Sequence, residues 1–135
     1  MDSCISNYFS LFGTGNHHSL NINDCASYFK LTYDYAEKNH DRISGLNYLR
    51  IRYEDLVQDQ ESVTRKVIAF IDEPWDEACL NHHLTKRVSR TISYEEVTRK
   101  VYTSSVSRYR NYEKFLSEPL EILKPIMEEY GYPDS

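Results

Sequence analysis

Apolar side chains recur in most of this chain at the three- and four-residue spacing of an α-helix. The pattern predicts a first helix within residues 1–11, a second from Asn23 to about residue 40, and a third over residues 60–71. A shorter helix is predicted over residues 76–82. Two helical faces follow in the last third of the chain, one with Tyr109, Tyr112 and Leu116 and the other with Leu120, Leu123, Met127 and Tyr130.

Residues with known effects on helix ends mark the expected boundaries. Asn23 or Asp24 can cap the second helix. The sequence Asp72-Glu73-Pro74 should end the third, because proline disfavours the helical conformation of the residue before it. Pro125 should kink or divide the last helix, and Gly131 should end it. The face of the second helix that we expect to be buried holds five residues: Ile22, Ala26, Phe29, Tyr33 and Ala36.

One segment alternates between apolar and polar residues and predicts a strand at residues 48–53. A single strand cannot form a stable sheet by itself. We therefore predict an α/β fold in which a helix-rich chain retains at least one strand, and we expect the domain to be incomplete.

Length and composition restrict the function classes. A chain of 135 residues, 40% of them hydrophobic, fits a single domain over residues 1–135 with a core of its own. The net charge of −5 argues against nucleic-acid binding, which needs excess positive charge. No apolar run is long enough to span a bilayer, and residues 1–4 do not begin a secretory signal.

The cysteines and histidines indicate no metal site. Cys4, Cys25 and Cys79 lie far apart, so they match neither a zinc-ligand spacing nor a C-x-x-C pair. Adjacent histidines at 17–18 and 82–83 point in different directions and have no accompanying carboxylates at ligand spacing. An odd, sparse set of cysteines is typical of buried thiols in a reducing compartment, which predicts a cytoplasmic location.

Two short strings hold polar groups suited to a phosphorylated ligand. Residues 1–8 read Met-Asp-Ser-Cys-Ile-Ser-Asn-Tyr, and Ser6 can donate a hydrogen bond to a phosphate oxygen from the opening of a helix. Residues 49–57 contain Arg-Tyr-Glu-Asp-Leu, and Tyr53 offers a ring for stacking where the predicted strand ends. Without further context, Ser6 also fits a plain helix surface and Tyr53 a core position.

Two later strings complete the pattern. Residues 70–80 contain Pro-Trp-Asp-Glu-Ala-Cys-Leu, in which Trp75 and Leu80 fit packing positions. Residues 101–112 contain Thr-Ser-Ser followed by Val-Ser-Arg-Tyr, which combines hydroxyls, backbone amides and an arginine fork suited to phosphate. A polar surface turn before a helix would look the same.

In order and spacing, the four strings resemble the C-terminal part of bacterial sulfotransferases that use 3′-phosphoadenosine 5′-phosphosulfate, especially those associated with tetratricopeptide repeats. The resemblance implies transfer of a sulfuryl group to a hydroxyl or amine acceptor, with adenosine 3′,5′-bisphosphate as the leaving product. It also implies cofactor contacts by six residues: Ser6, Tyr53, Thr103, Ser104, Ser105 and Arg108. A weaker similarity places Thr91 near the adenine, and residues 93–96 have the arrangement of a capping box.

Two departures from the family pattern concern the last string. Ser107 stands where the family usually has glycine, and Tyr109 stands where it usually has tryptophan. If that glycine has a positive φ, Ser107 carries a backbone cost at the same position.

The family's phosphate loop and catalytic base lie upstream of the first string, and no glycine-rich phosphate-binding string occurs in this chain. We therefore assign no catalytic residue and expect the chain to be inactive by itself. The alternative is a noncatalytic helical interaction or dimerisation module derived from the same fold. Self-association through the unpaired strand or an apolar face is expected in either case.

Overall fold

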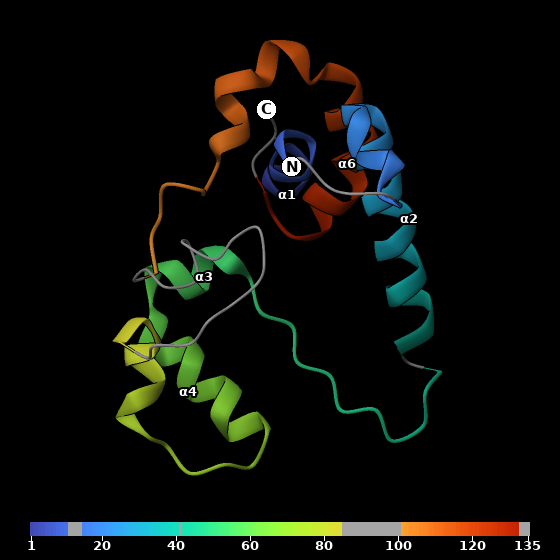
Figure 1. The fold of residues 1–135 in the computed structure, drawn as a ribbon. Helices are drawn as coiled ribbons and strands as arrows, with labels where there is room; N and C mark the ends of the chain where they lie inside the picture. The colour runs from blue at the N-terminus through green and yellow to red at the C-terminus, as the bar shows by residue number, and fades with distance from the viewer. Residues whose placement is uncertain (11–14, 41, 85–100, 133–135) are drawn as a thin grey trace. The chain divides into compact units, whose positions relative to one another are not determined.

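The structure is a computed structural model, and it describes residues 1–10, 15–40, 42–84 and 101–132 (Figure 1). Its regular elements are all α-helices or short 3₁₀ helices. In chain order they are α1 (Asp2–Phe9), η1 (His17–Leu20), α2 (Ile22–His40), α3 (Tyr53–Gln58), α4 (Gln60–Phe70), η2 (Glu77–Leu84), η3 (Arg108–Phe115) and α6 (Ser117–Glu129). The chain forms two compact units. Unit 1 comprises Met1–Leu46 and Ser107–Ser135, and unit 2 comprises Asn47–Val106.

Unit 1 has a hydrophobic core built where α1 and α6 pack against α2. A first cluster of buried side chains holds Cys4, Cys25, Ala26, Leu123 and Ile126. A second cluster holds Ile5, Tyr109 and Leu116. Since α1 supplies Cys4 to the first cluster and Ile5 to the second, this short helix joins α2 and α6 to η3.

The burial of α2 follows the sequence pattern only in part. Ala26 is fully buried, and Ile22 and Tyr33 pack against the first cluster, as the helical spacing predicts. Phe29 remains 39% exposed and Ala36 is exposed, whereas Cys25 is buried. The buried stripe is therefore displaced by one residue towards Cys25 in the first turn of α2.

Two residues of unit 1, Asn21 and Gly131, set helix ends. The Asn21 side chain accepts a hydrogen bond from the Asn23 amide at 2.8 Å, so Asn21 begins α2 and the expected caps Asn23 and Asp24 lie inside it. Gly131 has φ of +65° and donates to the Glu128 carbonyl, which ends α6 in a Schellman motif, as glycine at this position predicts. Pro125 lies within α6 without dividing it.

Unit 2 has no fully buried side chain among its described residues. Val63 and Val67 on α4 are half-buried, whereas Phe70 and Ile71 are 40% and 54% exposed. The helix ends because Asp72 adopts a left-handed conformation with φ of +57°, and its amide donates to the Ala69 carbonyl. The end of α4 thus precedes Pro74, which does not itself set it.

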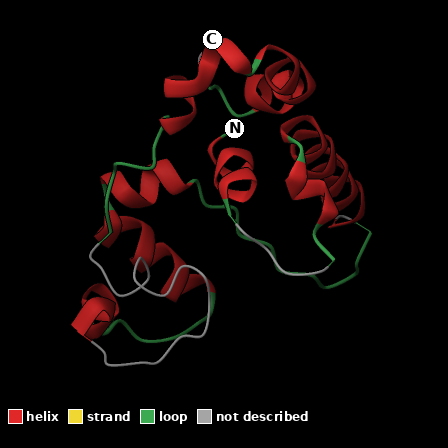
Figure 2. Ribbon diagram, turned by 45° about the horizontal axis from the view of Figure 1, so that its top comes forward, coloured by secondary structure: helices red, strands yellow, loops and turns green. Residues whose placement is uncertain are grey.

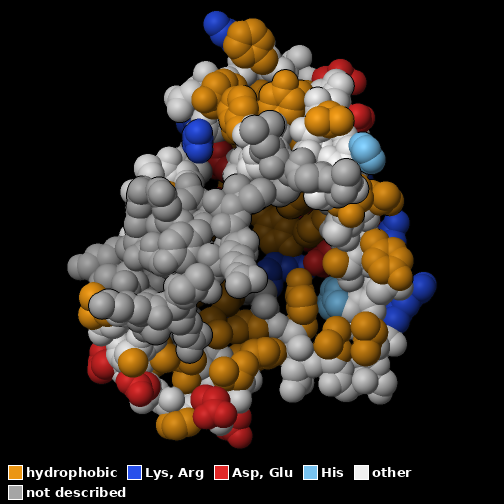
Figure 3. All heavy atoms as spheres, in the orientation of Figure 1, with side chains coloured by type: hydrophobic (Ala, Val, Ile, Leu, Met, Phe, Trp, Pro, Cys, Tyr) orange, Lys and Arg blue, Asp and Glu red, His pale blue; other side chains and the backbone are white. Residues whose placement is uncertain are grey.

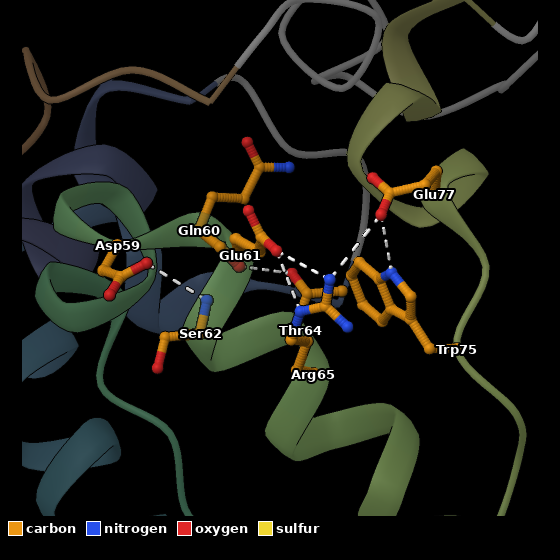
Figure 4. Close-up of polar contacts among 8 residues, drawn as sticks. All are labelled: Asp59, Gln60, Glu61, Ser62, Thr64, Arg65, Trp75 and Glu77. Carbon is orange, nitrogen blue, oxygen red and sulfur yellow. Dashed lines mark hydrogen bonds and ion pairs between the residues drawn. The ribbon is translucent and has the colours of Figure 1, made fainter.

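Trp75 is held at the surface of unit 2 by polar contacts from α4 (Figure 4). The Arg65 guanidinium lies 3.9 Å from the centre of the Trp75 ring and 2.7 Å from a Glu61 carboxylate oxygen. The indole N–H donates to Glu77 at 3.0 Å. Trp75 therefore packs against an arginine and its carboxylate partners, and a cation–π contact of this kind is worth about 0.5–1 kcal/mol at an exposed site.

The predicted strand at residues 48–53 is wrong, and with it the α/β fold with a retained strand. Residues 46–52 have no regular secondary structure, and α3 begins at Tyr53 (Figure 2). Over the whole part of the chain that the structure describes, no residue enters a β-ladder. An alternating pattern becomes a strand only when a neighbouring strand pairs with it, and the described residues supply none.

Two further sequence expectations, the contact by Thr91 and the capping box at residues 93–96, lie outside the described residues. Among the helices within the described ranges, none combines the length and hydrophobicity needed to cross a membrane.

Candidate functional site

Ser6 lies on α1 with an exposed side chain. Its carbonyl accepts a hydrogen bond from the Ser10 hydroxyl at 2.7 Å, which steadies the end of the helix. The Ser6 hydroxyl itself contacts no other described residue and is open to solvent. This placement leaves it available to a ligand, although it serves equally as an ordinary surface serine.

Tyr53 and the hydroxyl-rich string lie together in unit 2. Tyr53 is the first residue of α3, and its hydroxyl donates to the Tyr102 carbonyl at 3.1 Å. The Tyr53 side chain is 44% exposed, so it is not the core tyrosine that the sequence left open. The bond connects two strings that are 49 residues apart.

The hydroxyl-rich string forms a tight turn that leads into η3. The Val106 amide donates to the Thr103 carbonyl at 3.0 Å, and the Thr103 and Ser104 side chains are exposed. Ser107 then adopts φ of +57°, so the position does require the left-handed backbone that glycine favours. For a residue with a side chain this conformation costs roughly 1–2 kcal/mol.

Asp2 makes the contact that holds the start of η3, and sequence reasoning missed it. Its carboxylate accepts the Ser107 amide at 2.8 Å through one oxygen and the Tyr109 amide at 2.7 Å through the other. A carboxylate is well suited to the free amides at the start of a helix, because they carry partial positive charge. No local sequence signal points to this contact, because both partners of Asp2 are more than a hundred residues away along the chain.

Apolar packing reinforces the contact between α1 and η3. Ile5 is 3% exposed and Tyr109 is 7% exposed, and both belong to the second buried cluster. Tyr109 thus fills a packing position, while the neighbouring Arg108 side chain is exposed. The first and last of the four strings are therefore held together in unit 1, with Ser6 on one and Arg108 on the other.

The cysteines are placed for packing and not for nucleophilic chemistry. Burial is the main cause that raises the pKa of Cys4 to about 11, and burial also raises the pKa of Cys25. At neutral pH both are protonated thiols, which are poor nucleophiles and poor metal ligands. Within the described ranges, no group of histidine, cysteine or acidic side chains is arranged to hold a metal ion.

An open cavity of about 300 Å³ lies elsewhere in unit 1. It is bordered by Tyr8, Leu20 and Phe115 and by the start of α6. None of the six residues predicted to bind cofactor lines it. Within unit 1, this cavity is therefore separate from Ser6 and Arg108.

The described contacts thus bring α1 and the start of η3 together in unit 1, and Tyr53 and Tyr102 together in unit 2. A family model described as the sulfotransferase family matches residues 1–77, which is more than half of the chain. The chain belongs to the sulfotransferase family.

One relative is an uncharacterized protein of Aquifex aeolicus (strain VF5). It is 38% identical to this chain over 72 residues, which is 53% of the chain and 10% of that protein. The chain thus corresponds to a small part of a much longer relative.

Proposed function

We propose that this chain is the nucleotide-binding C-terminal part of a sulfotransferase that uses 3′-phosphoadenosine 5′-phosphosulfate. The observation that carries the proposal is the contact of Asp2 with Ser107 and Tyr109, because it joins the first and the last family-like strings. The bond from Tyr53 to Tyr102 supports it in unit 2. Chance similarity would not require two of the four strings each to contact the last one.

Each group has a chemical task in this proposal. The Tyr53 ring stacks against the adenine. Ser6 donates its hydroxyl to the 3′-phosphate, and Arg108 supplies a permanent positive charge with a planar set of donors. Thr103, Ser104 and Ser105 add hydroxyl and amide donors to the same end of the cofactor. The convergence of all six residues on one ligand stays a prediction.

The sulfuryl transfer itself needs groups that these residues do not supply. The acceptor hydroxyl or amine attacks sulfur, its proton passes to a base, and adenosine 3′,5′-bisphosphate leaves. Stabilising the charge on the transferring group requires donors aimed at it, and the assigned residues face the nucleotide end. We therefore propose that this chain holds the nucleotide and that the groups acting on the sulfate belong to another part of the enzyme.

An Arg108→Ala substitution should weaken binding of adenosine 3′,5′-bisphosphate about tenfold. A hydrogen bond to a charged group is worth about 1.5–3 kcal/mol, and a factor of ten corresponds to about 1.4 kcal/mol. Titration of the isotope-labelled chain with the bisphosphate, followed by amide chemical shifts, measures the affinity and maps the site. The shifts should gather at Ser6, at Tyr53 and along residues 103–108.

The matched control is Arg42→Ala, which removes the same charge from an exposed position in unit 1. It should leave the affinity unchanged. Equal weakening by both variants would mean that the chain attracts the nucleotide through net charge alone. Shifts gathered around the cavity at Tyr8 and Phe115 would place the nucleotide at a different site and reject the assignment.

A noncatalytic interaction module is the second candidate function, and one observation favours it. Large hydrophobic side chains are open to solvent in both units (Figure 3), and Leu20, Leu31, Tyr35, Phe115 and Leu84 are 67–77% exposed. Exposed apolar area of this kind marks surfaces that bind another protein. In this second candidate function, the exposed apolar side chains, and not a strand edge, contact a second copy of the chain.

The chain is accordingly expected to self-associate at micromolar concentration, because burying these side chains removes apolar area from water. Sedimentation velocity over a hundredfold range of concentration measures this, and a rise in weight-average mass is the expected result. If the mass stays that of a monomer and the chain binds the nucleotide, the nucleotide-binding function is supported and the interaction module is rejected. We also propose a cytoplasmic location, because the three unpaired cysteines fit a reducing compartment.

A further inference from the structure

Asp2 holds the backbone on both sides of Arg108. Its two carboxylate oxygens accept the amides of Ser107 and Tyr109, at 2.8 and 2.7 Å, so the residue between them is fixed at both neighbours. The Arg108 side chain is exposed, whereas the Tyr109 side chain is anchored in the core beside Ile5. The contact from α1 thereby fixes the backbone from which the Arg108 side chain extends.

The contact also explains how Ser107 can occupy its position. With φ of +57°, Ser107 lies in a left-handed conformation that glycine adopts readily and serine does not. Two charge-assisted hydrogen bonds to one carboxylate offset that backbone cost. If the carboxylate is removed, Ser107 gains by returning to a right-handed or extended conformation, and Arg108 turns with it.

We propose that Asp2 is a positioning residue for the phosphate-binding Arg108, acting through the left-handed turn at Ser107. This inference rests on the proposed nucleotide-binding function and extends it to a residue that touches no ligand. Because Asp2 already takes the first amides of η3, the phosphate is bound by side chains and not by these amides.

Asp2 also has an effect that acts in the opposite direction, so the sign of the change in nucleotide affinity tests the proposal. Asp2 lies one helical turn from Ser6 on the same face of α1, so its negative charge would repel a phosphate bound there. Removal of that repulsion would tighten binding, whereas loss of the positioned arginine would weaken it. The two amides and the positive end of η3 partly neutralise the carboxylate. Positioning therefore outweighs repulsion.

The first experiment measures the affinity of the chain for adenosine 3′,5′-bisphosphate in Asp2→Ala and Asp2→Asn variants. Asp2→Ala should bind about tenfold more weakly, a change that corresponds to about 1.4 kcal/mol. Asp2→Asn keeps one acceptor oxygen and should lie between Asp2→Ala and the unmodified chain. The matched control is Glu121→Ala, which removes the same charge from an exposed position of α6 in unit 1 and should bind normally.

The second experiment adds Ser107→Gly to the Asp2→Ala variant. Glycine adopts the left-handed conformation without the carboxylate, so affinity should return to within about threefold of the original value. A role of Asp2 in merely stabilising α1 would give no such rescue. If Asp2→Ala fails to fold, the comparison is made with Asp2→Asn, which retains a hydrogen bond to the loop.

Amide hydrogen exchange separates this inference from the proposed function, because it needs no nucleotide. The Ser107 and Tyr109 amides should exchange at least tenfold faster in Asp2→Ala than in the unmodified chain. Unchanged affinity, tighter binding or absence of rescue by Ser107→Gly would overturn the positioning role. If the unmodified chain binds no bisphosphate while exchange still responds to Asp2, the nucleotide-binding function fails and Asp2 is a structural clamp only.

Discussion

A Leu123→Ala substitution is expected to lower the free energy of unfolding of the chain by about 2–5 kcal/mol, the range measured for leucine truncations in protein cores. Leu123 is 2% exposed and lies where α6 meets Cys25 and Ala26 of α2. Truncation removes its apolar contacts and leaves a cavity that two packed helices cannot easily close. Single domains are only marginally stable, so much of the population should lose the fold of unit 1.

The matched control is Leu31→Ala on the exposed side of α2, where the side chain is 67% exposed. It should change stability by less than about 0.5 kcal/mol, because an exposed leucine buries little area. Urea titrations followed by circular dichroism measure both variants, since the described elements are helical. Equal effects would mean that α2 and α6 do not pack through Leu123.

Periodicity predicted the helices of this chain well because it reports which side of a helix meets the core. α1, α2, α4 and α6 occur close to the positions that the pattern indicates. Their ends were less predictable, since they depend on single side-chain bonds such as that from Asn21 to Asn23. Asp72 likewise ends α4 through a backbone conformation that a local pattern does not encode.

The strand prediction failed for a different physical reason. Alternation at residues 48–53 records which side chains would face each side of a sheet, but strands are stabilised by pairing with other segments. The local sequence holds no information about the presence of a partner. The exposure of Tyr48 and Ile51, at 51% and 40%, agrees with a segment that no sheet covers within the described residues.

The sequence indicated the candidate site residues as members of separate strings, but it did not indicate which strings contact one another. Family-like spacing singled out Ser6, Tyr53 and Arg108 as candidates, and their role stays a prediction. The sequence left open whether position 107 has a positive φ, and the structure gives Ser107 a φ of +57°. Asp2 escaped notice because its two partners are more than a hundred residues away in sequence. Such a contact becomes visible only when α1 and η3 are brought together by their buried side chains.

The unfolding free energy is expected to decrease steadily as the pH rises from 9 to 11. Burial raises the pKa of Cys4 from 9.0 to about 11, so in this range the unfolded chain releases the thiol proton while the folded chain keeps it. Stability is complete below pH 9 and falls by about 1.4 kcal/mol per pH unit above it, or roughly 2–3 kcal/mol in all. Tyr33 acts in the same direction, because burial and its hydrogen bonds to Tyr130 and Glu129 raise its pKa.

Urea titrations at pH 8, 9, 10 and 11 measure this slope, and two cysteine variants assign it. Cys4→Ala should be less stable at pH 8, because it leaves a small cavity beside Leu123. Its unfolding free energy should then decrease less steeply with pH, because the Cys4 thiol no longer contributes. Cys79→Ala removes a half-buried thiol of unit 2 and should retain the full slope of unit 1. The same slope in Cys4→Ala as in the unmodified chain would show that the Cys4 thiol is accessible to water in the folded state. Tyr33→Phe and Cys25→Ala then divide the remainder, since Tyr33→Phe removes the hydroxyl that bonds Tyr130 at 2.8 Å and Cys25→Ala removes the other thiol whose pKa burial raises.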